Sequence, residues 1–168
     1  MHFSASQVFI FGLLALTTQA RPADEPDTVY RKDTRTPGQI EDAGGFQTKA
    51  QTNNLPPNMN LRTHLMPPGG TVQGNSGFVS TTKDPKYANK WAGGGGYTYE
   101  IAKPPTEPKP PGYLDANKEV PDNKFSQQKE MSSMGNIPAS QINSAQQVQR
   151  GKPVGPKVPM GKPSGSRG

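Results

Sequence analysis

The stretch VYRKDTRTPGQIEDAGGF, residues 29–46, begins with charged residues at alternate positions of a predicted strand. Alternate residues of a strand share a face, so Arg31, Asp33 and Arg35 are expected to point in one direction. Two interpretations follow from this pattern. The three residues belong either to a solvated edge strand or to the wall of a pocket that binds an anion.

The second half of this stretch predicts a short helix. Thr36 suits the cap position, Pro37 the first helical position, and Gln39 completes a capping box three residues after the cap. The pair Gly44 and Gly45 then ends the helix.

Outward from this stretch, the chain alternates short strands, short helices and long loops. Helices are predicted at residues 60–66 and 85–92. In the second helix Tyr87 and Trp91 are expected to face the core, because residues four apart share a helix face. Strands are predicted at residues 28–33, 77–82, 97–102, 129–135 and 137–148, and loops at 47–60 and 112–127. The pattern predicts an α+β fold of short, mostly antiparallel strands with short helices and long Pro/Gly loops.

Composition limits the size of the core. The chain has 168 residues, enough for one ordinary domain, but Gly and Pro contribute 19 residues each and hydrophobic residues only 30%. There is no cysteine, so the fold contains no disulfide. The net charge of +6 is concentrated after residue 149, where five basic residues and no acid occur. Residues 150–168 are therefore predicted to form a basic disordered tail, with a weak contact to an anionic membrane surface as the functional alternative.

The N-terminus predicts export. Residues 1–20 contain the apolar run VFIFGLLAL followed by TTQA, which is typical of a cleaved signal peptide, although no Lys or Arg precedes the run. A buried N-terminal helix is the alternative. Residues 21–27 are interpreted as an N-terminal extension, and the protein is predicted to be secreted.

Several classes of chemistry are disfavoured by the residues available. His64 is the one histidine that remains after removal of the signal peptide, and without cysteine no metal site is predicted. No G-x-S-x-G motif supports a serine hydrolase. The glycines at 93–96 lack the Lys-Ser/Thr end of a phosphate loop, and the basic tail has no aromatic residues to stack on nucleic-acid bases.

Five segments in order resemble the A chains of cholera toxin and heat-labile enterotoxin, which are mono-ADP-ribosyltransferases. They are VYRKDTRTPGQIEDAGG, NLRTHLM, GFVSTT, YTYEIA and QKEMSSMGNIPASQI, and they cover a domain of residues 28–149. The chain is also similar to secreted fungal enterotoxin-like proteins. It departs from the family at Thr82, which replaces a serine, and it lacks the family's disulfide-closed loop and second-chain linker. No disulfide-linked partner chain is therefore expected.

The resemblance implies an ADP-ribosyltransferase fold and NAD as the substrate. Glu130 would be the catalytic carboxylate, stabilising the positive charge that develops on the ribose as nicotinamide leaves. Arg31 would bind the phosphate region of NAD, and Ser80 would hydrogen-bond Glu130. The remaining implied NAD-site residues are Thr81, which would support the strand, Asp33, which would orient its neighbours, and the active-site histidine His64.

Gln128 is predicted to select the acceptor. It lies two residues before Glu130 and is therefore predicted to face the same way on a strand. Family members with glutamine at this position, such as the pertussis toxin catalytic subunit and pierisin, modify groups other than arginine. The resemblance thus implies transfer to a host protein or nucleic acid at a group other than arginine.

Plainer interpretations remain for each residue and for the protein. Glu130 and Gln128 are also compatible with solvated loop positions, His64 with a surface histidine, and Arg31 with a surface ion pair to Asp33. At the level of function, the alternatives are an NAD glycohydrolase and a catalytically inactive secreted effector that uses the toxin fold as a binding scaffold.

Overall fold

The computed structural model describes residues 28–91, 95–102 and 112–161, so the predicted signal peptide and N-terminal extension lie outside the described residues. Within these ranges the strands are β1 Thr28–Asp33, β2 Gly45–Phe46, β3 Phe78–Thr82, β4 Gly96–Ala102, β5 Tyr113–Asp115, β6 Glu130–Met134, β7 Ile137–Pro138, β8 Ile142–Gln149 and β9 Lys152–Pro159. The helices are α1 Pro37–Asp42, α2 Lys49–Thr52, α3 Leu61–Leu65, α4 Pro85–Lys90 and α5 Ala116–Glu119, with single 3₁₀ turns η1 Pro68–Gly70, η2 Ser126–Gln128 and η3 Ala139–Gln141.

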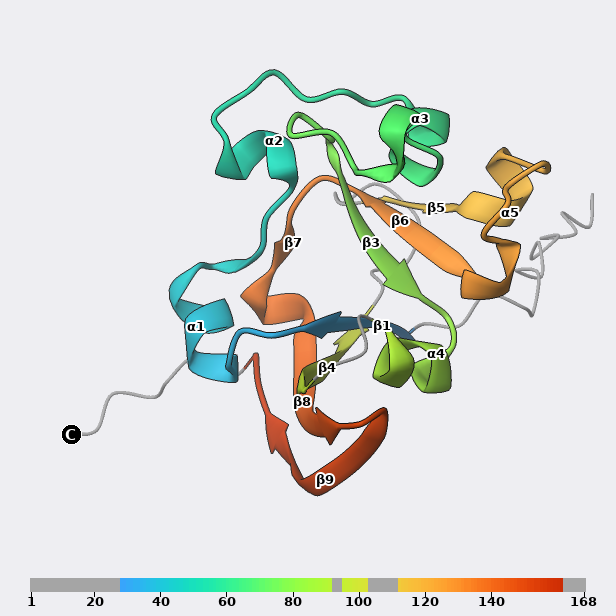
Figure 1. Cartoon of the computed structure of the whole chain (residues 1–168). Helices are drawn as coiled ribbons and strands as arrows, with labels where there is room; N and C mark the ends of the chain where they lie inside the picture. Colours follow the sequence, from blue (N-terminus) through green and yellow to red (C-terminus); the bar gives the residue numbers. More distant parts are fainter. Residues whose placement is uncertain (1–27, 92–94, 103–111, 162–168) are drawn as a thin grey trace, which may run out of the picture.

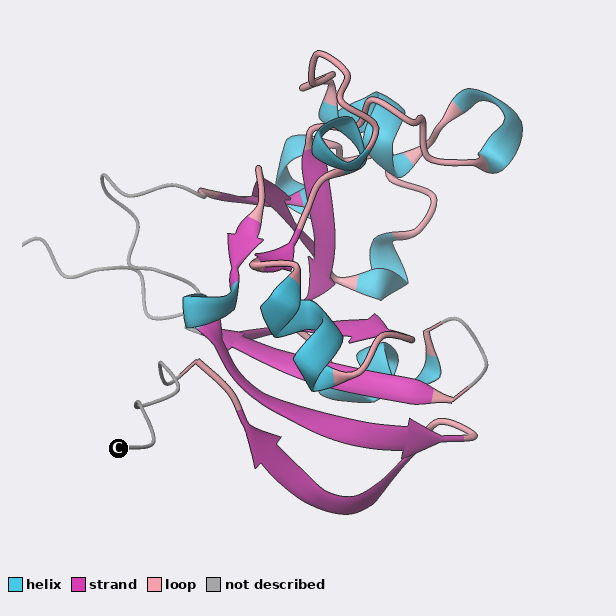
Figure 2. Cartoon of the chain, turned by 90° about the vertical axis from the view of Figure 1, so that its left-hand side faces the viewer, coloured by secondary structure: helices cyan, strands magenta, loops and turns pink. Residues whose placement is uncertain are grey.

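Seven strands form one antiparallel sheet in the order β5-β6-β3-β1-β4-β8-β9. The sheet bends sharply at its centre, because β1 and β3 are joined through the single pair Tyr30 and Thr82, whereas β1 and β4 pair along their whole length. Figure 1 shows the consequence, since β3 runs steeply whereas its neighbour β1 lies almost horizontally, and in Figure 2 the long strands of the lower part lie across the steep strands above them. The predicted α+β class with mostly antiparallel strands is confirmed.

The main core fills the inner face of the bent sheet. Its members come from both halves of the chain and include Val29, Ile40, Phe46, Tyr99, Ile101, Met131, Ile137, Ile142 and Met160. A smaller cluster packs beneath α3 and contains Leu61, Leu65, Phe78, Ala116 and Val120. None of the helices in the described part of the chain is long and apolar enough to cross a bilayer.

The stretch 29–46 folds as its local signals predict. The backbone N–H of Thr36 donates to the side chain of Gln39 at 2.9 Å, and the Gln39 N–H donates back to the Thr36 hydroxyl at 3.4 Å, which completes the capping box of α1. Gly45 has a φ of 118°, and a Cβ there would lie 2.1 Å from the carbonyl oxygen of Ile137. Glycine at this position is therefore required for the close pairing of β2 with β7.

Two predicted loops contain regular structure, and one predicted strand is interrupted. The 47–60 loop contains α2, capped by the Thr48 side chain, and the 112–127 loop contains β5 and α5, with Asp115 as the helix cap. The predicted strand at 137–148 is divided into β7 and β8 by η3, which follows Pro138.

The prediction of a disordered tail from residue 150 is wrong for the segment that forms β9. This strand pairs with β8 at the edge of the sheet, where its prolines need not donate backbone hydrogen bonds to a further neighbour. Met160, directly after the strand, is 7% exposed and belongs to the main core. The last seven residues of the predicted tail, 162–168, lie outside the described residues.

The prediction that Tyr87 and Trp91 face the core is wrong. The buried residue of α4 is Ala88, whereas Tyr87 and Trp91 are half-buried with ring centroids 6.2 Å apart. The helix ends at Lys90, and Trp91 has an extended backbone, so its ring lies outside the helical register. This places the only tryptophan of the chain beside the candidate site.

Candidate active site

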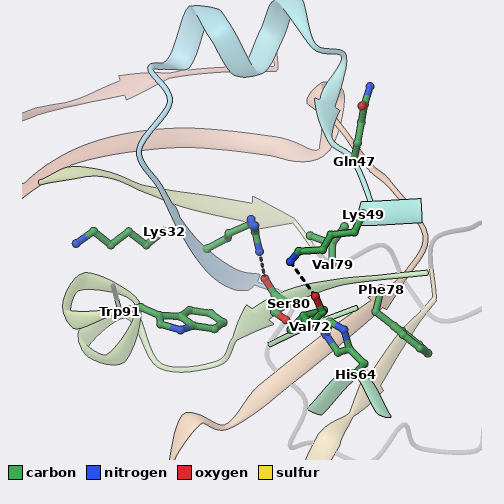
Figure 3. A pocket seen from close by; sticks show the side chains of 10 residues that line it. Lys32, Gln47, Lys49, His64, Val72, Phe78, Val79, Ser80 and Trp91 are labelled. Atoms are coloured by element: carbon green, nitrogen blue, oxygen red, sulfur yellow. Dashed lines mark hydrogen bonds between the residues drawn. The ribbon is translucent and has the colours of Figure 1, made fainter. Parts of the chain in front are cut away.

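Two adjoining cavities lie where β3 crosses the end of α3. Their volumes are about 280 and 500 Å³, and they share the lining residues His64, Val72, Ser80 and Trp91. Figure 3 shows the smaller cavity, into which the ring of Trp91, the residue after α4, points towards Ser80. Together the cavities form one cleft, which we call the central cleft.

His64 lies at the base of the central cleft. Helix α3 holds it there, because the Asn60 side chain caps this helix by accepting from the Thr63 backbone N–H at 3.0 Å. The imidazole Nδ1 lies 2.8 Å from Ser76 Oγ, and its Nε2 lies 2.9 Å from Ser80 Oγ. His64 is 7% exposed, so the surface position considered from the sequence does not apply.

Glu130 contacts the same imidazole nitrogen of His64, Nε2, as Ser80 does. Its Oε1 atom lies 3.2 Å from His64 Nε2, and the carboxylate is buried although it is the first residue of β6. An ionised carboxylate can only accept hydrogen bonds, so we assign the proton of the neutral imidazole to Nε2. In that tautomer Nδ1 accepts from the hydroxyl of Ser76.

Ser132 is a site residue that the sequence analysis missed. Its hydroxyl donates to Glu130 Oε1 at 2.8 Å, in the role predicted for Ser80. Ser80 reaches the carboxylate through His64 instead, since both contact Nε2. The signal was available, because Ser132 is two residues after Glu130 and residues i and i+2 of a strand share a face. Ser132 also pairs across the sheet with Ser80.

Arg31 extends from β1 into the smaller cavity. Its Nη1 donates to the Ser80 carbonyl at 2.7 Å, and the guanidinium lies 5.2 Å from the centre of the Phe46 ring. Its Nε atom is buried and makes no hydrogen bond to the described residues. Burial lowers the pKa of Arg31 and the Asp33 carboxylate partly opposes this, but an arginine stays charged at neutral pH.

Asp33 and Thr81 are close to the cleft but are not among the residues that line it. Asp33 accepts two side-chain hydrogen bonds from Arg35, at 2.9 and 2.8 Å, and lies 3.9 Å from Arg31 Nε. Burial alone would raise the pKa of Asp33, but the hydrogen bonds from Arg35 and the charge of Arg31 together hold it below its ordinary value. Thr81 is fully buried and donates to the Met131 carbonyl at 2.5 Å, on the opposite face of β3 from Ser80.

Gln128 lines the larger cavity, but not by the predicted route. It lies in the 3₁₀ turn η2, and Lys129 has a left-handed backbone with φ of 47° before β6 begins at Glu130. The prediction that both residues lie on one strand is therefore wrong. The Thr82 hydroxyl holds the turn in place by donating to the Gln128 carbonyl at 2.6 Å.

The lining of the central cleft is cationic, which the sequence analysis did not anticipate beyond Arg31. Lys32 and Lys49 line the smaller cavity and Lys124 the larger one, whereas Glu130 is the sole carboxylate among the described lining residues. Lys49 Nζ donates to the Val72 carbonyl at 3.1 Å (Figure 3). A cleft of this charge favours an anionic ligand.

Comparisons with known proteins agree with this geometry. The sequence matches the Scabin-like family over residues 29–158. A guanine-specific ADP-ribosyltransferase has 25% identity and a TM-score of 0.59, with 76% of this chain and 71% of that chain covered. Scabin toxin from Streptomyces scabies in complex with NADH has 26% identity and a TM-score of 0.55, with coverages of 73% and 65%.

The heat-labile enterotoxin of E. coli is also similar, at 25% identity and a TM-score of 0.59, with 78% of this chain and 74% of that chain covered. No curated protein matches the sequence significantly.

The bent antiparallel sheet and the buried glutamate beside an arginine-lined cleft define an NAD-dependent ADP-ribosyltransferase of the toxin class. Within that class, the chain belongs to the Scabin-like family. The resemblance, the fold and the enzyme class predicted from the sequence are confirmed.

Proposed function

We propose that the protein is a secreted mono-ADP-ribosyltransferase toxin that transfers ADP-ribose from NAD to a guanine base of a host nucleic acid. The observation that carries this proposal is the buried Glu130 carboxylate, oriented by His64 and Ser132 at the base of a cationic cleft. The apolar run within residues 1–20 supports secretion.

The lining residues fit the chemistry of NAD. The pyrophosphate is anionic, and the buried Nε of Arg31 is a donor that still needs an acceptor. Lys32, Lys49 and Lys124 add positive charge. The Trp91 ring borders both cavities and offers a flat apolar surface to the nicotinamide or adenine ring.

Glu130 would act on the transition state more than on the substrate. As the bond between the ribose C1′ and the nicotinamide nitrogen breaks, its electron pair stays with nicotinamide and positive charge develops on the ribose. The carboxylate opposes that charge inside a water-poor site. A lone pair of the acceptor then forms the new bond to C1′, and the acceptor loses a proton.

A guanine acceptor is supported by the wall of the larger cavity. The amide of Gln128 can donate and accept at once, which suits a base edge with both kinds of group. Phe125, 43% exposed, offers a stacking surface, and Lys124 offers a charge for the phosphate. The similarity to a guanine-specific ADP-ribosyltransferase points the same way.

Nicotinamide release tests the catalytic part of the proposal. The purified protein should cleave NAD, and Glu130→Gln should lower kcat by roughly 10²–10³-fold. Glu119→Gln, on the exposed side of α5, is the matched control and should retain full activity. A folded native protein that releases no nicotinamide would instead support the inactive scaffold.

Labelled NAD tests the acceptor. Label should appear on guanosine and be absent from agmatine, which presents the guanidinium of arginine. Transfer to agmatine alone would overturn the guanine proposal, and nicotinamide release without transfer to either compound would identify an NAD glycohydrolase. Gln128→Glu should reduce transfer to guanosine far more than NAD hydrolysis, whereas equal effects would remove Gln128 from acceptor selection.

A further inference from the structure

One segment carries the groups that we assign to acceptor binding. Residues 121–129, called here the 121–129 turn, contribute Lys124, Phe125 and Gln128 to the larger cavity. The facing wall is formed by α3 and residues 66–72. The separation of these two walls therefore depends on how the turn is held.

The C-terminal end of the turn is fixed by a buried anchor. Thr82 is fully buried, and its hydroxyl donates to the Gln128 carbonyl at 2.6 Å. The backbone N–H of Lys83 donates to the Lys129 carbonyl at 3.1 Å, and Lys129 Nζ lies 3.4 Å from Asp84 Oδ2. These contacts tie this end to β3 and to the start of α4.

The N-terminal end is held to α5 by the buried Asn123, whose Nδ2 donates to Asn117 Oδ1 at 3.1 Å, and Asn117 Nδ2 donates to the Ser126 carbonyl at 2.9 Å. It follows Val120, which packs with residues of α3 in the smaller core cluster. At the surface, an exposed ion pair joins the turn itself to α3. The two terminal guanidinium nitrogens of Arg62, Nη1 and Nη2, donate to the two carboxylate oxygens of Asp122 at 2.7 and 2.5 Å. Arg62 is on α3, two residues before His64, and so points away from the catalytic side of that helix. Its side chain is 60% exposed and that of Asp122 is 63% exposed.

We propose that Arg62 and Asp122 form a latch that positions the 121–129 turn against α3 and thereby sets the width of the acceptor side of the central cleft. This proposal rests on the proposed function. Both residues act as positioning residues, because neither lines the cavities. The bidentate geometry and the 60-residue sequence separation make this pair a link between the two walls rather than a local surface contact.

The latch is expected to affect transfer and to leave NAD cleavage unchanged. His64 is on α3 and contacts Ser76 and Ser80, and Glu130 is on β6 and accepts from Ser132. None of these contacts involves the 121–129 turn, so displacement of the turn leaves them in place. Gln128 and Phe125 move with the turn. An exposed pair has a modest energetic effect, so the expected change in transfer is roughly two- to fivefold.

Charge reversal tests the latch with guanosine as the acceptor, which is neutral and adds no salt dependence of its own. Arg62→Asp and Asp122→Arg should each lower transfer two- to fivefold and keep the kcat of NAD hydrolysis within twofold. The double variant should recover transfer, because the pair is rebuilt with exchanged charges. Arg150→Asp, in the exposed β8–β9 turn, is the matched control and should change neither rate.

Equal losses of transfer and hydrolysis, or a double variant no better than the single ones, would overturn the proposal. Hydrogen exchange provides a readout that does not depend on the acceptor. Amides of residues 121–129 should exchange faster in each single variant and return to native rates in the double variant, and unchanged exchange in all variants would also overturn the latch. If the native protein modifies no acceptor, the proposed function fails, and exchange alone decides whether the pair holds the turn.

Discussion

The hydroxyl of Ser132 donates a 2.8 Å hydrogen bond to the carboxylate of Glu130, two residues earlier on β6. Both side chains are buried, so the bond lies in a region where solvent does not compete for the carboxylate. With His64 on the same oxygen, Ser132 fixes the direction in which Glu130 faces the cleft. The proposed catalytic carboxylate is therefore oriented both by a residue of its own strand and by His64 of α3.

Ser132→Ala should lower the kcat of NAD cleavage about tenfold, because one hydrogen bond to a charged group contributes roughly 1.5 kcal/mol. The KM for NAD should stay within twofold, since Ser132 does not line the cavities. Ser133→Ala is the matched control, because its buried hydroxyl donates instead to the Gly135 carbonyl at 3.1 Å. Equal losses of kcat in the two variants would show that the effect is structural.

Trp91 should report NAD binding directly. It is the only tryptophan in the chain and borders both cavities, so NAD should change its fluorescence on titration. Trp91→Ala should raise the KM for NAD about tenfold through loss of ring contact, whereas Trp91→Phe, which keeps an aromatic ring, should raise it less. If NAD is cleaved but leaves the fluorescence of the native protein unchanged, Trp91 does not contact the substrate.

Asp33 should make folding stability depend on pH in the acid range. Its pKa in the folded protein lies below the unfolded value, so the unfolded chain binds more protons as the pH falls. The stabilising contribution is complete above the unfolded pKa of about 3.9 and disappears as the pH falls through the folded pKa. Asp33→Asn should therefore cost roughly 1–2 kcal/mol at pH 7 and progressively less below about pH 4.

Urea unfolding at pH 7 and pH 3 measures this difference. Asp42→Asn, an exposed position at the end of α1, is the control and should have nearly native stability at both values. A stability loss in Asp33→Asn that is the same at pH 7 and pH 3 would contradict the assignment of the effect to the Asp33 carboxylate.

Elements with local causes could be predicted from the sequence. The α1 helix, with its capping box, depends on contacts between Thr36 and Gln39, three residues apart. Alternation predicts β1 and β4, and strand-forming residues predict β3, and all three lie centrally in the sheet. The segments β5, α5 and α2 were missed, because their short polar sequences become regular only against partners distant in the chain.

In the candidate site, too, local sequence predicts some features, whereas others depend on residues distant in the chain. The structure brings His64, Ser80 and Glu130 together, as the order of motifs implied, although composition alone indicated none of these contacts. The four-residue spacing from Tyr87 predicts a core position for Trp91 only within a helix, whereas α4 ends one residue before Trp91. The sequence predicts a strand at Gln128 because it contains no signal for the left-handed backbone of Lys129, which separates Gln128 from β6.

Strand β9 provides a test of how far the domain extends beyond residue 149. It pairs with β8, the Gln146 amide donates to the carbonyls of Val154 and Gly155, and Lys157 pairs with Glu100 at 2.7 Å. A chain ending at residue 161 keeps all of these contacts, so the midpoint of its urea unfolding should equal that of the full chain. A chain ending at 151 loses them together with Met160.

The shorter chain should lose at least 2–5 kcal/mol of stability, because removal of a buried side chain such as Met160 alone has a cost of about this size. It should also expose the edge of β8 and tend to associate. Met160→Ala in the full chain separates the loss of the buried side chain from the loss of β9, because this variant removes the core contact and keeps the strand. Native stability of the chain ending at 151 would mean that β9 lies outside the cooperative unit of the domain.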